Sequence, residues 1–378
     1  MFANRIRYFI PLMVATMLTQ TAQTTQAEQP LVFISAFNGG EKGAIHAFTL
    51  DVEAGALKPL HRTAGVENPF FMAISKDHKY LYSIFAKSFG GKDPEEVAAY
   101  ALEGRTGKMK LINKQSTHGS ASCYVDVDTT GKTVLVSNYN TGNVVSLPVK
   151  ADGSLGEAVS NFLHKSLDQP EKKPNAHCFV VSPDNRFALS ADLGVHQVFT
   201  YKLDAASAKL TAGMPPFVKS PAGSGPRHLT FHPNGKRVYV INETKSSVTY
   251  FDYDVDKGAL TEKQTISTLP EDFKGQSFCA DVKITPNGKF LYGTNRGHDS
   301  IAIYRIGDDG RLTLVGIEPS LGQQPQNLLI AGDGKLLICA NMSGNSVVEF
   351  RINGENGTLK SAGEPVSIPM PSCMRIIP

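Results

Sequence analysis

Short runs of alternating apolar and polar residues recur along most of this chain. One set consists of Leu229-Thr230-Phe231, then Arg237-Val238-Tyr239-Val240, then Ser247-Val248-Thr249-Tyr250-Phe251. Alternation with a period of two is typical of β-strands that bury one face. No segment sustains an apolar period of 3.6 residues. The pattern therefore predicts an all-β protein without long helices.

A polar turn separates the first two strands of each set. The second residue of this four-residue turn is mostly Asp or Asn, the third is mostly Gly and the last is mostly Lys, as in Pro233-Asn234-Gly235-Lys236. Six copies follow one another at intervals of 46 to 54 residues. Asn-Gly and Asp-Gly between apolar runs favour tight hairpins because such turns need a positive φ. A second marker, mostly Gly-x-Leu, falls between the third and fourth strands. It begins at Gly55, Gly107, Gly153, Ala208, Gly258, Gly310 and Gly357.

Four short antiparallel strands per repeat are the unit of a β-propeller blade. The seven copies of the second marker predict seven blades. Residues 31–50 resemble the second and third strands of a blade that lacks its first, and residues 371–377 resemble a lone first strand. Pairing these ends would complete the seventh blade. We therefore predict that residues 28–378 form a seven-bladed β-propeller, closed by pairing of the N-terminal strands with the C-terminal strand.

Residues 1–27 have the features of a secretory signal peptide. Arg5 and Arg7 precede a short apolar stretch, Phe9 to Leu18, and a small-residue site predicts cleavage after Ala27. The stretch is much shorter than the roughly 20 residues that span a bilayer, and no later segment reaches that length. We therefore expect a periplasmic or secreted protein without a membrane span.

Charge and cysteine content narrow the range of partners and bonds. The formal net charge of +3 over 378 residues gives no reason to expect a nucleic-acid partner. Four of the five cysteines begin the same strand in different repeats, where they should be further apart than the roughly 7 Å that a disulfide allows between Cα atoms. We expect free, buried thiols at Cys123, Cys178, Cys279, Cys339 and Cys373.

The repeat also provides an internal control, because a reactive residue found in only one or two blades is a candidate for function. The start of the first strand is occupied in turn by Phe70, Cys123, His177, Arg227, Ala280, Gln326 and Ser372. The end of the second strand is occupied by Ala86, Tyr139, Leu193, Glu243, Arg296 and Met342. Antiparallel pairing brings these two positions to the same rim. The four ionisable exceptions, His177, Arg227, Glu243 and Arg296, should therefore meet at one mouth of the central channel.

A histidine, a carboxylate and two guanidinium groups can activate water and hold an anionic oxygen compound. Each also has a structural interpretation: His177 as a satisfied rim histidine, Glu243 as a solvated turn residue, and the arginines as struts bonded to carbonyls. His228 and His118 lie near the same rim and are weaker candidates for substrate contact. No metal or other cofactor is expected, because we find no metal-ligand spacing, phosphate-binding glycine loop or nucleophile elbow.

At these residues the sequence resembles the seven-bladed propeller lactonases, a family that includes a bacterial 6-phosphogluconolactonase and the fungal carboxymuconate lactonising enzyme. The resemblance covers essentially all of the mature chain. It is most specific at Gly225-Pro226-Arg227-His228, Asn242-Glu243, Asn295-Arg296-Gly297-His298 and Ala176-His177. It implies a site made of His177, Arg227, Glu243 and Arg296, without a metal or organic cofactor.

Two departures from the family pattern fall near this site. Asn175 stands where the family often has a further histidine, which makes Asn175 a candidate for substrate contact. Pro325-Gln326 stands where the family usually has Pro-Arg.

The resemblance implies hydrolysis of a sugar or organic-acid lactone, with a small anionic lactone or sugar acid as the ligand. Glu243 or His177 would activate water, and the other would orient it or protonate the leaving alkoxide. Arg227 and Arg296 would hold the anionic group and the developing oxyanion. A muconate-type lactonising isomerase would use the same groups. A non-catalytic propeller that binds a ligand or protein at its mouth is a further alternative, since a fold does not determine a function.

Overall fold

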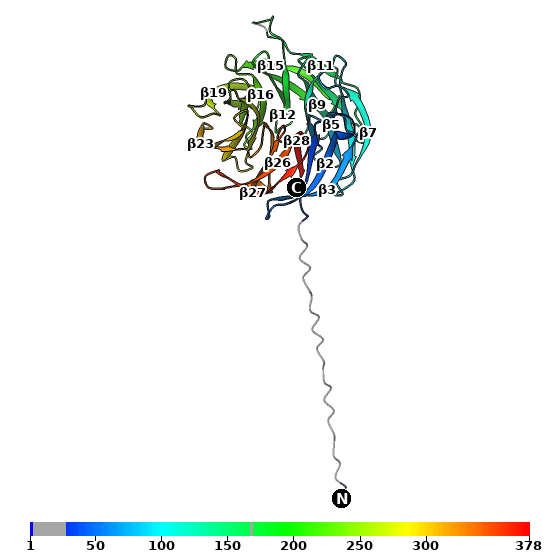
Figure 1. The fold of residues 1–378 in the computed structure, drawn as a ribbon. Coiled ribbons are helices and arrows are strands. Elements are labelled where there is room, and N and C mark those ends of the chain that lie inside the picture. The colour runs from blue at the N-terminus through cyan, green and yellow to red at the C-terminus, as the bar shows by residue number, and fades with distance from the viewer. Residues whose placement is uncertain (3–27, 167–168) are drawn as a thin grey trace.

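The computed structural model describes residues 1–2, 28–166 and 169–378. These residues form seven four-stranded antiparallel sheets arranged in a ring (Figure 1). Helical structure within them is limited to two short 3₁₀ turns, η1 (Gly40–Lys42) and η2 (Gly332–Gly334), and no helix is long and apolar enough to cross a bilayer. The predicted seven-bladed β-propeller is confirmed. All but the first two residues of the predicted signal peptide lie outside the described residues.

Each blade is one sheet, numbered in chain order from the first complete sheet, and its strands are given from the channel outward. Blade 1 contains β4 (Met72–Ile74), β5 (Tyr80–Phe85), β6 (Glu96–Leu102) and β7 (Met109–Ser116). Blade 2 contains β8 (Ser122–Val127), β9 (Thr133–Asn138), β10 (Asn143–Pro148) and β11 (Ser160–Leu163). Blade 3 contains β12 (Ala176–Val181), β13 (Phe187–Asp192), β14 (Gln197–Asp204) and β15 (Lys209–Lys219).

The remaining blades follow the same plan. Blade 4 contains β16 (Pro226–Phe231), β17 (Arg237–Asn242), β18 (Ser247–Asp254) and β19 (Ala259–Ser267). Blade 5 contains β20 (Phe278–Ile284), β21 (Phe290–Arg296), β22 (Ser300–Ile306) and β23 (Leu312–Pro319). Blade 6 contains β24 (Pro325–Ala331), β25 (Leu336–Asn341), β26 (Ser346–Ile352) and β27 (Leu359–Ser367). Blade 7 contains β28 (Pro371–Ile377), β1 (Leu31–Ala36), β2 (Ala44–Asp51) and β3 (Ala56–Ala64).

Blade 7 closes the ring with strands from both ends of the described chain. Strand β28 pairs antiparallel with β1, in a register that sets Leu31 opposite Ile377 and Ser35 opposite Cys373. This is the predicted pairing. The inner strands of neighbouring blades contact each other around the whole ring, and β28 lies between β24 and β4.

The core lies between the blades. Every residue of β1, β9, β13 and β25 is buried, because each second strand is covered on both faces by adjacent blades. The outermost strands are largely exposed, as in β19, where Leu260 is the single buried residue and partly buried residues alternate with exposed ones towards the end of the strand. This gradient explains why the sequence shows continuous apolar runs in some strands and alternation in others.

The first residue of the Gly-x-Leu marker lies at a contact between blades. Gly153 has φ +81°, and a Cβ atom there would lie 2.1 Å from the ring of Tyr80 in the preceding blade. The carbonyl of Gly357 accepts a hydrogen bond of 2.9 Å from the Tyr292 hydroxyl, again on the preceding blade. At these positions the marker therefore needs a residue that tolerates positive φ and leaves space for an aromatic ring.

All five cysteines are free and buried, as expected from their positions on separate strands.

Candidate active site

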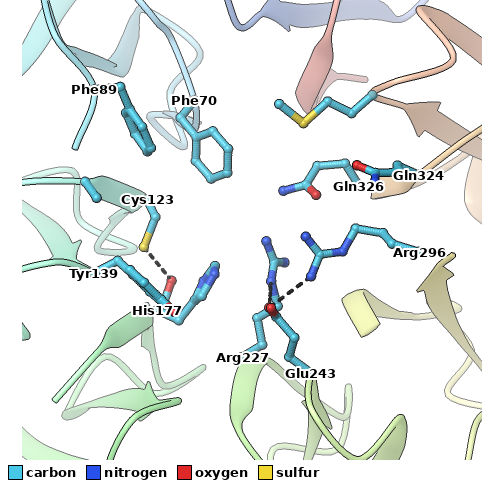
Figure 2. Close-up of a pocket in the computed structure, with 12 residues that line it drawn as sticks. Phe70, Phe89, Cys123, Tyr139, His177, Arg227, Glu243, Arg296, Gln324 and Gln326 are labelled. Carbon is cyan, nitrogen blue, oxygen red and sulfur yellow. Dashed lines mark hydrogen bonds and ion pairs between the residues drawn. The ribbon is translucent and has the colours of Figure 1, made fainter. Parts of the chain in front are cut away.

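A cavity of about 260 Å³ opens at one mouth of the central channel (Figure 2). Its walls contain the four ionisable residues that interrupt the repeat, together with aromatic, apolar and amide side chains. The lining residues are Phe70, Phe89, Ala121, Cys123, Tyr139, His177, Arg227, Glu243, Arg296, Gln324, Gln326 and Met342. The expectation that His177, Arg227, Glu243 and Arg296 meet at one rim therefore agrees with the geometry.

Bulges at the start of the inner strands direct side chains to this cavity. In β12 the register with β13 shifts between Ala176 and Cys178, so His177 is an extra residue without a partner. Arg227 is the extra residue in β16. A bulge bends a strand and changes the direction of one side chain. The same shift occurs at Cys123 in β8 and at Gln326 in β24, which also line the cavity.

Glu243 is held by both arginines of the site. It follows β17 directly, and its Oε2 lies 2.8 Å from Nε of Arg227 and 3.0 Å from Nη2 of Arg296. The Arg227 side chain is 2% exposed, whereas those of Glu243 and Arg296 are each 20% exposed. The single carboxylate therefore sits between a buried and a partly exposed cation.

Backbone carbonyls of blade 5 hold the guanidinium groups in place. Nη1 of Arg227 donates to the Ala280 carbonyl over 2.5 Å. Nε and Nη2 of Arg296 donate to the carbonyls of Phe278 and Cys279 over 3.3 and 3.0 Å. Burial and the neighbouring charge of Arg227 lower the pKa of Arg296 to about 10. Arg296 therefore remains a cation at neutral pH.

His177 is buried at the edge of the cavity. Its ring makes edge-to-face contacts with Tyr139 and His228, with centroid distances of 5.5 and 5.3 Å. Burial, followed by the charge of Arg227, holds the pKa of His177 well below its usual value. The ring is therefore neutral at neutral pH. Its buried Nδ1 has no hydrogen-bond partner within the described part of the chain.

The wall opposite Glu243 is aromatic. Phe70 and Phe89 lie across the open space from the ion pairs in Figure 2, with their ring centroids 5.2 Å apart. Phe37, which follows β1, packs edge-to-face against both rings at 5.0 and 4.9 Å. The cavity therefore has a charged side and an apolar side.

Three residues predicted to contact substrate do not line this cavity. His228 is buried behind Arg227, because the residue after a bulge points to the other side of the strand. The side chain of Asn175 is turned away and donates to the Tyr139 carbonyl over 2.8 Å. His118 is exposed on the loop before β8, where its φ of 52° belongs to a turn. The structure therefore does not bring His228, His118 and Asn175 to the cavity, and their contact with substrate stays a prediction.

The cavity also contains residues that the search for ionisable exceptions missed. Gln326 and Met342 occupy the same two repeat positions as the charged residues, and position alone could have identified them. Phe89, Ala121 and Gln324 lie in loops that the repeat does not cover. Over the residues that the structure describes, no cluster of three or more His, Cys, Asp or Glu side chains could hold a metal ion.

Comparison with known proteins identifies the family. A family model described as "Lactonase, 7-bladed beta-propeller" matches residues 31–376. The chain belongs to this lactonase family. That result confirms the resemblance inferred from the sequence.

Individual lactonase relatives match over nearly their whole length. The 6-phosphogluconolactonase of Bacillus subtilis (strain 168) is 33% identical over 350 residues, which cover 91% of this chain and 97% of the relative. The 6-phosphogluconolactonase of Formosa agariphila is 30% identical over 338 residues, which cover 87% of this chain and 94% of the relative. The structure of the periplasmic gluconolactonase of Pseudomonas aeruginosa matches with a TM-score of 0.85 at 26% identity, covering 92% of this chain and 99% of that chain.

Proposed function

We propose that this chain is a lactonase that hydrolyses an unphosphorylated sugar lactone at the mouth of its channel. The observation that carries the proposal is the arrangement of Glu243, Arg227 and Arg296 around a cavity of about 260 Å³. Two relatives named 6-phosphogluconolactonase and a neighbour named gluconolactonase support the reaction class. The reaction adds water to a cyclic ester and yields an open-chain hydroxy acid.

Glu243 is the general base in this proposal. Both of its ion pairs use Oε2, and no partner of Oε1 occurs in the described ranges. Oε1 can therefore accept a proton from a water molecule that attacks the lactone carbonyl. The two ion pairs keep the carboxylate in one orientation, so the attacking water is held in a defined direction.

Arg227 and Arg296 stabilise the oxyanion that forms on the carbonyl oxygen. Each has one terminal amino group, Nη2 of Arg227 and Nη1 of Arg296, for which the described residues offer no hydrogen-bond partner. The other nitrogens are fixed by Glu243 and by blade 5 carbonyls. Donors held in advance at the site of developing charge lower the barrier without reorganising during the reaction.

His177 orients the leaving group. Since Nδ1 is buried, Nε2 is the ring nitrogen that can reach a ligand, and its N–H donates a hydrogen bond to the ring oxygen. When the ring C–O bond breaks, the alkoxide takes, through solvent in the cavity, the proton that Glu243 gained from water. The product then ionises as a carboxylic acid, which releases one proton per turnover.

The charge of the site favours a lactone without a phosphate. With His177 neutral, Arg227, Arg296 and Glu243 give a formal charge of +1. A phosphate monoester carries about −1.5 to −2 at pH 7, which this charge does not balance. Gln326 adds an amide at a position where an arginine would add a cation. The aromatic wall of Phe70 and Phe89 suits the C–H face of a sugar ring. The expectation of an anionic substrate stays a prediction, which the 6-phosphate and the organic-acid lactones of the panel test.

The proposed location is the cell envelope or the exterior. It rests on the signal-like residues 1–27 and on the similarity to the periplasmic gluconolactonase of Pseudomonas aeruginosa. Mass spectrometry of the protein from a cell-envelope fraction should find a mature chain that begins at Glu28. A chain that keeps Arg5 and Arg7 in the cytosolic fraction would contradict this location.

A lactone panel tests the function. Purified protein is mixed with glucono-δ-lactone, its 6-phosphate and several organic-acid lactones, and proton release is followed above the spontaneous rate. We expect glucono-δ-lactone to be hydrolysed with a higher kcat/KM than its 6-phosphate. The reverse order would overturn the substrate assignment. If no lactone is hydrolysed but one still raises the melting temperature, the non-catalytic binding function replaces the lactonase.

A further inference from the structure

A buried histidine–carboxylate pair lies directly behind Arg227, which lines the cavity. Nδ1 of His228, on β16, is 2.9 Å from Oδ1 of Asp281, on β20. Both side chains are almost completely buried. Nε2 of the same imidazole is 3.3 Å from Nη1 of Arg227. The three groups therefore form a continuous line from the channel interior to the site.

The neighbours of Asp281 determine which hydrogen bonds each of its carboxylate oxygens accepts. Oδ2 accepts hydrogen bonds from Nδ2 of Asn327 at 2.7 Å and from the backbone N–H of Leu328 at 2.9 Å. The Lys283 ammonium contacts Oδ1 and Oδ2 at 2.7 and 2.6 Å. Burial opposes ionisation, but the charge of Lys283 and these donors hold the pKa of Asp281 well below its usual range. Asp281 is therefore an ionised carboxylate.

An ionised Asp281 determines the tautomer of His228. Burial and the charge of Arg227 lower the pKa of His228 to about 3, so the ring carries one proton at neutral pH. Since Oδ1 of Asp281 can only accept, that proton lies on Nδ1. Nε2 then presents its lone pair to Arg227, whose Nη1 donates to it.

We propose that the His228–Asp281 pair positions Arg227 for catalysis by fixing the tautomer that accepts a hydrogen bond from its guanidinium group. This inference rests on the proposed lactonase function. Arg227 is then held at Nε by Glu243 and at Nη1 by Ala280 and His228. Its remaining amino group is left for the oxyanion.

The Asp281→Asn substitution tests the tautomer. Asn327 and Leu328 donate at the position of Oδ2, so the amide oxygen must take that position. The amide nitrogen then faces Nδ1 of His228 and requires it to accept. The ring proton moves to Nε2, where it points at an N–H of Arg227 and displaces the guanidinium. We expect kcat to fall roughly ten- to a hundred-fold, as for a misplaced catalytic group, while KM changes less than threefold.

Two substitutions of His228, to Gln and to Asn, distinguish the positioning of Arg227 from a role of His228 in packing alone. His228→Gln carries an amide oxygen near the position of Nε2 and can accept from Arg227 without Asp281. His228→Asn resembles only the Nδ1 side of the ring and cannot reach Arg227. We expect His228→Gln to keep kcat within about fivefold of the wild type and His228→Asn to match Asp281→Asn. The double variant Asp281→Asn/His228→Gln should recover the kcat of His228→Gln, because its amide no longer depends on residue 281.

Tautomer detection gives a readout that needs no substrate. ¹⁵N NMR of histidine-labelled wild-type protein should find Nδ1 of His228 protonated, and the Asp281→Asn spectrum should find Nε2 protonated. If the wild type hydrolyses no lactone, the proposed function fails while this measurement still decides the geometry. A wild-type ring protonated at Nε2 would overturn the inference. So would equal kcat values for folded His228→Gln and His228→Asn, or a double variant no better than Asp281→Asn.

Discussion

The guanidinium group of Arg227 is almost completely buried, whereas the Glu243 carboxylate, 2.8 Å from it, keeps a fifth of its side-chain surface open to the cavity. The arginine therefore has a fixed position, and the carboxylate is the partner that a ligand or water can approach. Buried charges that lose a partner are costly, so changes at the two positions should have different effects.

Glu243→Gln should retain the fold and lose most of the activity. The amide is nearly the same size and its oxygen can still accept from Arg227, but it cannot take a proton from water. General bases contribute about 10²–10⁴-fold in rate, so kcat for a lactone found by the panel should fall by that order with little change in KM. Steady-state kinetics and a melting curve check this. Wild-type kcat in the variant would remove Glu243 from the mechanism.

Arg227→Lys should impair both activity and stability. One ammonium group cannot contact Glu243, the Ala280 carbonyl and His228 at once. We expect kcat to fall by at least roughly tenfold and the free energy of unfolding to fall by about 2 kcal/mol. Arg296→Lys is the matched control, because this more exposed site should lose less stability in denaturant titrations. Equal losses of stability at the two positions would argue against the buried role of Arg227.

The free energy of unfolding should decrease as the pH falls below about 6.5. Burial holds the pKa values of His177 and His228 below that of a free histidine, which is 6.5. The unfolded chain then binds protons that the folded chain does not, so acid favours unfolding. Urea titrations from pH 8 to 5 measure the slope. His177→Gln should reduce it, and an unchanged slope would show that His177 is not held neutral.

Glu349 should have the opposite pH dependence. It is buried on β26, its carboxylate has no ion-pair partner among residues 28–166 and 169–378, and burial raises its pKa to about 7. Between the ordinary value of 4.5 and 7 the folded chain keeps a proton that the unfolded chain loses, so this group destabilises the fold as the pH rises. Glu349→Gln should be more stable than the wild type by on the order of 3 kcal/mol at pH 8 and equal to it at pH 4. A destabilised variant at pH 8 would contradict this.

The cysteines should be unreactive in the folded protein. Burial raises the pKa of Cys123, which lines the cavity, to about 12, so its thiolate is scarce at neutral pH. Thiol counting on denatured, non-reduced protein should find five groups, and native protein should react only slowly with iodoacetamide. A denatured count of three or one would reveal disulfides.

The repeat made the fold predictable, because a turn with a residue at positive φ recurs in six blades, and an aromatic ring packs against the marker glycine at Gly153, Gly258, Gly310 and Gly357. It also located His177, Arg227, Glu243 and Arg296, whose positions depend on strand ends. The orientation of His228 could not be predicted, because it depends on the bulge at Arg227, which only the observed register reveals. The exact position of Phe89 could not be predicted either, because its loop is held by contacts of Glu95 with Gly90 and Ala121, which no strand pattern encodes.

The pairing of β1 with β28 has a consequence for biosynthesis. The hydroxyl groups of Ser35 and Ser372 lie 2.9 Å apart although 337 residues separate them in the chain. Until the ribosome has made β28, one edge of β1 has no partner, and an unpaired edge can join strands of other nascent chains. The order of synthesis therefore delays ring closure until after translation of six other blades. A chain still open at that point also remains suitable for threading through a secretion channel.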